Sequence, residues 1–81
     1  MDESTIRDAI SRTLAGIAPE VSLEQIVATV PLRDQIDLDS MDWLNFIVGL
    51  HEQLHVDIPE ADYRKLRTLN DLIAYLRAKS G

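Results

Sequence analysis

One short stretch of the chain places a serine hydroxyl among carboxylates. Ser40 lies in the run DLDSMD at positions 37–42. Between residues 34 and 63 there are eight Asp and Glu side chains and no Lys or Arg, although the whole chain has a net charge of −6. The rest of the chain is therefore slightly basic, and the acidity belongs to one surface that attracts basic partners. A hydroxyl in this place either caps a helix or stands exposed at the helix start.

A second candidate for chemistry is the sequence HEQLH at positions 51–55, which matches the H-E-x-x-H pattern of zinc peptidases. In those enzymes two His side chains hold the metal and the Glu acts as general base. A catalytic zinc normally takes a third protein ligand inside a cleft, and here Glu60 or Asp62 would have to supply it. We therefore expect no metal site and no catalytic residues, and interpret the His pair as solvated side chains near a helix C-terminus. A zinc hydrolase remains the alternative.

Length and composition limit the remaining classes of function. A chain of 81 residues supports one hydrophobic core, so residues 1–81 are expected to form a single domain. The acidic balance argues against nucleic-acid binding, which depends on neutralising phosphates with Lys and Arg. No apolar run approaches the length of a membrane span, and the N-terminus is acidic rather than basic as in a signal peptide. We expect a cytoplasmic monomer without cysteine chemistry.

The apolar spacing predicts an all-α fold with three longer helices. The first should run from about residue 4 to 18 and end at Pro19, and the second from about 40 to 55, with Asp39 and Asp42 at its start. Thr68 and Asp71 should open the last. The apolar residues at helical spacing are Ile6, Ile10, Leu14 and Ile17 in the first helix, and Leu69, Leu72, Ile73 and Leu76 in the last.

The connecting segments are expected to contain one short helix. It should follow Pro59 and run toward Leu66, after an extended break at residues 56–59. Ser22 and Gln25 resemble a capping box for a brief helical turn, and the segment from Pro31 to Leu38 reads as loop. No strand is expected. The predicted architecture is a small bundle of three longer helices and one short helix.

The second helix has two apolar faces, and only one of them can be its core face. The expected core residues are Trp43, Phe46, Ile47, Leu50 and Leu54. Met41, Leu44 and Val48 fall on another side, rotated by roughly 120° at about 100° per residue. We call these three residues the outer strip. An exposed apolar strip with acidic neighbours suggests a protein-docking surface, although scattered apolar residues on a surface need no function.

Four segments in register together resemble an acyl carrier protein. They are residues 39–42 (DSMD), the helix that follows, residues 56–60 (VDIPE) and residues 68–76. The resemblance covers about residues 32–76 without gaps. It implies that Ser40 carries 4′-phosphopantetheine, which a phosphopantetheinyl transferase attaches from coenzyme A. The thiol of that arm would hold acyl groups as thioesters, so the protein itself would need no catalytic machinery.

The resemblance also implies a docking surface and a set of partners. Partners would be the transferase and the acyl-transferring, synthase or ligase enzymes of fatty-acid, polyketide or related specialised metabolism, all with basic docking surfaces. The partner-facing positions are Asp39, Met41, Asp42, Leu44, Val48 and Glu52.

Some positions depart from the family pattern and leave alternatives open. Asp37 replaces a frequent Gly, and Asn45 and His51 stand where acids are common, so a specialised pathway is the second choice. Trp43 either fills the core or limits a pocket for the acyl chain. A peptidyl or aminoacyl carrier, or an unmodified helical adaptor that docks through the outer strip, are the other functions considered. The cluster of Arg64, Lys65 and Arg67 is interpreted as a solvated face.

Overall fold

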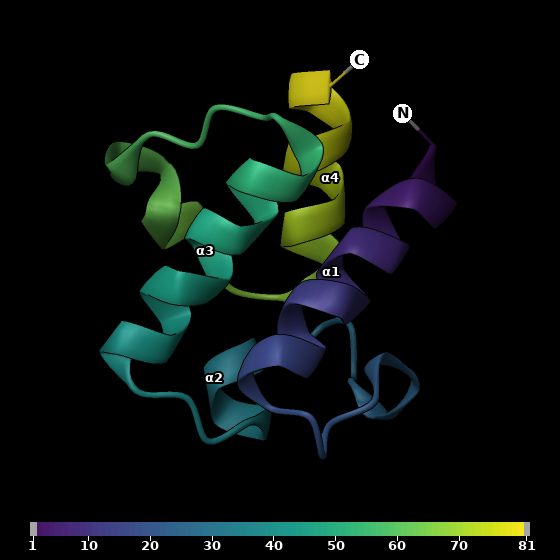
Figure 1. The fold of residues 1–81 in the computed structure, drawn as a ribbon, viewed down its shortest axis with the longest axis vertical. Coiled ribbons are helices and arrows are strands. Elements are labelled where there is room, and N and C mark those ends of the chain that lie inside the picture. The colour runs from purple at the N-terminus through teal and green to yellow at the C-terminus, as the bar shows by residue number, and fades with distance from the viewer. Residues whose placement is uncertain (1, 81) are drawn as a thin grey trace.

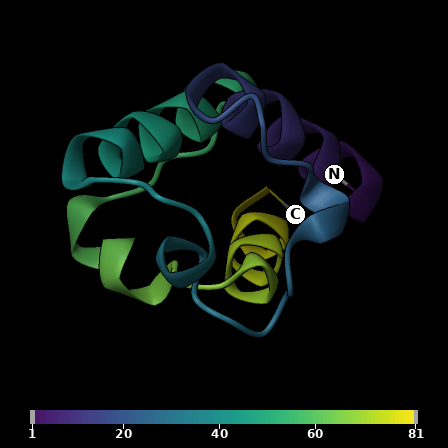
Figure 2. The ribbon, with the colours of Figure 1, turned by 90° about the horizontal axis from the view of Figure 1, so that it is seen from below.

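A computed structural model describes residues 2–80 of the chain, and it contains helices and no strands over that range (Figure 1). The elements, in chain order, are α1 (Glu3–Ile17), the 3₁₀ turn η1 (Leu23–Gln25), α2 (Leu32–Gln35), α3 (Ser40–Leu54), the 3₁₀ helix η2 (Glu60–Lys65) and α4 (Leu69–Ser80). Figure 2, which looks from the end at which α3 begins, shows α4 nearly along its axis with α1 and α3 beside it. The predicted all-α bundle of three longer helices is confirmed.

The three long helices begin at side chains that satisfy free backbone N–H groups. The Asp2 carboxylate accepts from Thr5 N–H at 2.9 Å and starts α1 one residue before the predicted position. Thr68 Oγ1 accepts from Asp71 N–H at 3.0 Å ahead of α4, as its sequence indicated. Such caps compensate N–H groups that have no partner within the helix, and they fix the residue at which each helix begins.

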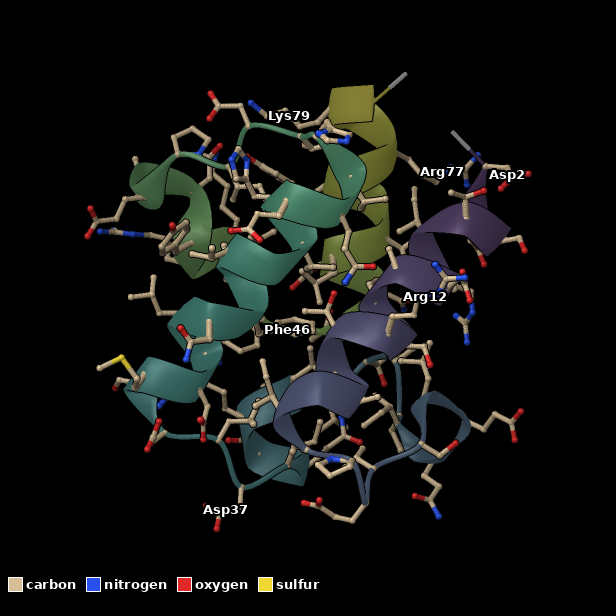
Figure 3. All side chains as sticks on the ribbon, in the orientation of Figure 1. Asp2, Arg12, Asp37, Phe46, Arg77 and Lys79 are labelled. Carbon is tan, nitrogen blue, oxygen red and sulfur yellow. The ribbon has the colours of Figure 1, made fainter. Side chains whose placement is uncertain are left out.

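One hydrophobic core joins the long helices. Phe46 points from α3 into the interior (Figure 3), and the predicted core residues of α1 and α4 are buried with it, apart from the half-buried Ile17. The fully buried larger side chains come from all three long helices and from the segment before α4. They are Phe46, Ile6, Ile10, Ile47, Leu50, Leu66, Leu69, Leu72 and Leu76. The sequence therefore located the core faces correctly.

A glycine sets how closely α1 and α3 approach. A Cβ atom on Gly49 would stand 2.6 Å from Thr13 Cγ2, well inside van der Waals contact. Thr13 is buried and its hydroxyl donates to Ala9 O at 2.7 Å, while Gln53 Nε2 donates to the same hydroxyl. Because these two hydrogen bonds hold the Thr13 hydroxyl in place, its methyl group cannot easily turn away, and α3 packs this closely here only with a residue that lacks a Cβ.

The prediction that the segment from Pro31 to Leu38 is loop was wrong for residues 32–35. They form α2, a single helical turn closed by Ile36 N–H donating to Leu32 O at 2.9 Å. Leu32 is buried, and its N–H donates to Arg67 O at 2.8 Å, far along the chain. Gln35 bonds back to the carbonyls of residues 27 and 30 at 2.9 and 2.8 Å, and its Oε1 accepts from Val27 N–H at 2.8 Å. These contacts with residues outside the turn, rather than the spacing of apolar residues within it, hold the turn.

The other connecting segments follow the sequence expectations. Residues 56–59 have no regular structure, and the short helix expected after Pro59 is present as the 3₁₀ helix η2. Ser22 N–H donates to Gln25 Oε1 at 3.4 Å at the predicted turn η1. Ile58 and Leu66, on either side of η2, are buried, whereas no residue within η2 is fully buried. The segment is thus anchored at its two ends.

Candidate functional site

Ser40 is the first residue of α3, and it is exposed to solvent. The preceding residue, Asp39, is the N-cap: its Oδ1 accepts from Asp42 N–H at 2.8 Å. The Asp42 carboxylate lies 3.5 Å from Asp39 N–H and completes a capping box. Because Asp39 performs the capping, the Ser40 hydroxyl is not needed for it, and no hydrogen bond to that hydroxyl occurs within residues 2–80.

The surroundings of Ser40 combine two opposing electrostatic effects. The start of α3 carries partial positive charge from its aligned peptide dipoles and favours an anion. Asp37, which projects outward where α3 begins (Figure 3), and Asp39 are exposed, and Asp42 is half-buried nearby. Their negative charge partly offsets the dipole, so this surface attracts a basic partner more strongly than a free anion. A hydroxyl here is accessible to a separate enzyme that brings its own basic groups.

The outer strip is exposed, as the helical spacing predicted. Met41 is 65% exposed, Leu44 43% and Val48 40%, which are high values for large apolar side chains. Glu52 is also exposed, so the only predicted docking residue that is half-buried is Asp42, which takes part in the capping box. Met41, Leu44, Val48 and Glu52 therefore share one side of α3, and Asp39 and Asp42 lie at its start. The contact of these six predicted residues with a partner remains a prediction.

Trp43 is half-buried rather than fully buried, and it contributes both to the core and to a cavity. Its ring packs on Phe46 with the ring centroids 5.4 Å apart. It also lines a cavity of about 510 Å³ with residues from α2, η2 and their flanking segments: Pro31, Arg33, Asp34, Leu38, Tyr63, Arg64, Leu66 and Arg67. The sequence analysis left both the core and a pocket open for Trp43, and the residue takes part in both. The basic residues that line the cavity with it were not anticipated, because α2 was not expected and is distant in sequence from η2.

A smaller cavity of about 140 Å³ lies between α3 and the segment that follows it. Tyr63 lines both cavities, and Ile47 and Ile58 contribute apolar surface to the smaller one. His51 and Val48 also line it, so it opens beside the outer strip. The larger cavity therefore lies beside the start of α3, at Trp43, and the smaller one lies farther along the helix, at residues 47–51.

The two histidines of the H-E-x-x-H sequence both stand at the C-terminal end of α3. His51 Nδ1 hydrogen-bonds Val56 O at 2.7 Å, and His55 adopts the left-handed conformation with φ 53° that ends the helix. No group of three or more His, Cys, Asp or Glu residues that could hold a metal ion occurs within residues 2–80. The geometry thus gives His51 a role in the helix C-terminus.

Tyr75 of α4 connects this helix to η2 and lies in an acidic environment. Its hydroxyl donates to Asp62 Oδ2 at 2.6 Å, and Lys65 pairs with the other oxygen of that carboxylate at 3.3 Å. Burial, followed by the hydrogen bond to Asp62, raises the pKa of Tyr75 to about 12. The same hydrogen bond, with help from Lys65, holds the pKa of Asp62 below its usual value. This contact fixes η2 against the bundle.

Comparison with known proteins gives the family. The chain matches the family described as "Phosphopantetheine attachment site" over residues 4–76. It is 31% identical over 78 residues to an acyl carrier protein of Desulforapulum autotrophicum, with 96% of each chain covered. The chain belongs to the acyl carrier protein family. An acyl carrier protein of Kineococcus radiotolerans is also 31% identical, over 74 residues that cover 84% of this chain and 91% of the relative. The family resemblance read from the sequence is confirmed.

Membership of the acyl carrier proteins brings a prosthetic group and a type of activity. The group is 4′-phosphopantetheine, covalently attached, and its thiol supplies the chemistry of acyl transfer. Acyl carrier proteins act through the enzymes with which they interact rather than as catalysts. This chain offers an exposed hydroxyl at a helix start, which fits a phosphodiester-linked group. No helix within residues 2–80 is long and apolar enough to cross a membrane.

Proposed function

We propose that Ser40 is the residue that carries 4′-phosphopantetheine and that the carrier holds acyl groups as thioesters on the end of this arm. Support comes from the exposure of Ser40, from its place as first residue of α3, and from the assignment of the capping function to Asp39. In the attachment step, Ser40 Oγ bonds to the pantetheine-side phosphorus of coenzyme A. The pyrophosphate P–O bond breaks, adenosine bisphosphate leaves, and the hydroxyl proton passes to a base on the transferase.

The same geometry explains why the reaction would belong to a partner enzyme. No side chain hydrogen-bonds the Ser40 hydroxyl within the described residues, so no base of the chain is in position to activate it. The resulting phosphodiester would lie at the positive end of the α3 dipole, which stabilises its negative charge. Activation of the hydroxyl is therefore a task of the transferase, whereas the α3 dipole favours the charge of the product.

The docking surface proposed for these partners is the side of α3 that carries the outer strip. Apolar contact would come from Met41, Leu44 and Val48, which are exposed together. Charge complementarity would come from Asp39, Asp42 and Glu52 against basic groups of a phosphopantetheinyl transferase or of acyl-transferring, synthase or ligase enzymes. Exposed apolar side chains beside carboxylates give both affinity and a rapid, salt-sensitive encounter.

The proposal is tested by modification of the purified protein. Incubation with coenzyme A and a broad-specificity phosphopantetheinyl transferase is expected to add the mass of one phosphopantetheine, and Ser40→Ala is expected to abolish the addition. Ser11→Ala, which removes an exposed hydroxyl from α1, is the matched control and should be modified at the wild-type rate. Addition to Ser40→Ala, or no addition to the wild-type protein by several transferases, would contradict the assignment.

A further inference from the structure

The larger cavity is basic although it lies beside the acidic start of α3. Three arginines line it, Arg33, Arg64 and Arg67, and the one acidic residue in its lining is Asp34. All four are exposed, so the cavity opens to solvent. Its lining has a charge opposite to that of the carboxylates around Ser40, although the chain as a whole has a net charge of −6.

The arginines come together because of backbone contacts between distant segments. Leu32 N–H donates to Arg67 O at 2.8 Å, which places α2 beside the segment that follows η2. Figure 2 shows α2 between η2 and α4, on the side where α3 begins. The cavity therefore has basic residues on two of its walls, and Trp43 of α3 lines it as well.

None of the three arginines forms an ion pair within 4.0 Å in the part of the chain that is described, unlike three other cations of the surface. Arg12 pairs with Asp8, Lys65 with Asp62, and Arg77 with Glu3. Guanidinium groups bind carboxylates with two parallel hydrogen bonds, so arginines without an internal partner around one cavity favour an anionic ligand. The apolar residues of the lining, Trp43, Leu38 and Leu66, suit a short chain of methylene groups.

We propose that this cavity receives the free carboxylate of a dicarboxylic acyl group carried on the carrier's own arm. The inference rests on the proposed attachment at Ser40. Trp43 follows Ser40 by three residues, which is about 4.5 Å along α3 and on the same side of the helix. An extended pantetheine chain is much longer than this separation, so it can fold back and deliver a thioester-linked group to the cavity. The class of cargo is thus an acyl group with an acidic end.

The test compares two cargoes of equal length that differ in charge. The apo protein is loaded by a transferase from glutaryl-coenzyme A or from pentanoyl-coenzyme A, and the intact mass verifies each product. The chain has one tryptophan, so its single indole N–H resonance belongs to Trp43, which lines the cavity. An exposed guanidinium–carboxylate contact should favour the state with the cargo in the cavity by about two- to fivefold. We expect the glutaryl form to displace this resonance from its position in the holo protein, and the pentanoyl form to leave it near that position.

Charge variants identify the residues responsible. Arg64→Gln combined with Arg67→Gln is expected to make the glutaryl spectrum coincide with the pentanoyl spectrum. The matched control is Arg12→Gln combined with Arg77→Gln, which removes two positive charges from α1 and α4 at residues that do not line the cavity. This control should preserve the difference between the glutaryl and pentanoyl spectra. If the cavity variant does not fold, salt provides the same comparison in the wild-type protein, because 1 M salt shortens the screening length to about 3 Å and should remove the glutaryl effect.

Three results would overturn the inference. Equal displacement by both cargoes would show an apolar pocket without selection for charge. A displacement already present between the apo and holo proteins, and lost in the cavity variant, would assign the arginines to the phosphate of the arm instead. No displacement with the glutaryl form would show that the cargo does not enter. Failure of the loading step itself would show in the intact mass and would concern Ser40, not the cavity.

Discussion

Asp39 is expected to contribute separately to stability and to recognition, and two substitutions distinguish the contributions. Its carboxylate accepts a 2.8 Å hydrogen bond from Asp42 N–H, which caps α3. Asp39→Ala removes the cap and should lower the free energy of unfolding by about 1 kcal/mol. For a domain of this size that corresponds to a decrease in Tm of about 4–8 °C. Asp39→Asn retains a capping oxygen and should lower the stability by no more than a few tenths of a kcal/mol.

The rate of modification at Ser40 should follow charge instead of stability. Both Asp39 variants lose one negative charge beside the hydroxyl, so kcat/KM of a phosphopantetheinyl transferase should fall by a similar factor, about two- to fivefold, in both. Asp37→Asn is the control, because Asp37 is exposed and lies outside the capping box. Asp37→Asn should change kcat/KM of the transferase with no change in Tm. Equal Tm values for Asp39→Ala and Asp39→Asn would refute the capping argument, and wild-type kcat/KM in Asp39→Asn would refute the role of its charge.

Three further predictions concern the scaffold. Gly49→Ala should destabilise the protein by up to about 2 kcal/mol in urea unfolding, because overpacking against Thr13 outweighs the gain in helix propensity. In a Thr13→Ser background, which removes the clashing methyl group, Gly49→Ala should instead stabilise the protein by about 1 kcal/mol. The raised pKa of Tyr75 means that the folded state holds its proton more tightly, so stability should fall as pH rises from 10.0 to about 12, and Tyr75→Phe should lack this decline. Gln35→Ala should cost about 1–2 kcal/mol in urea unfolding, since three hydrogen bonds are lost, and an unchanged unfolding midpoint would show that they contribute nothing.

The long helices could be predicted from the sequence because their determinants are local. Apolar residues at steps of three and four define the core face of α1, and Asp39 and Asp42 mark the start of α3 through contacts three residues apart. The position of Ser40 follows directly, since it is the next residue after the cap. The exposure of Met41 follows equally from its angle on the helix.

The features that the sequence did not predict depend on contacts between distant residues. The α2 turn is held by Arg67 O and by the side chain of Gln35, and neither contact has a signature in the spacing of residues 31–38. The basic cavity needs Arg33 beside Arg64, which only the docking of α2 against the end of η2 brings about. The reading of Arg64 and Arg67 as a solvated face was correct about their exposure and left out the cavity that they line.

The way η2 is attached has a consequence for the exchange of one cargo for another. Ile58 and Leu66 enter the core on either side of it, while the six residues between Pro59 and Leu66 bury no side chain completely. Outward movement of this segment therefore breaks the Tyr75–Asp62 hydrogen bond and uncovers part of Tyr63, but it leaves the three long helices packed. Its amide hydrogens should exchange with deuterium sooner than those of α1, α3 and α4. Movement of η2 can therefore enlarge the adjacent cavities for a bulky acyl group while the hydrophobic core stays folded.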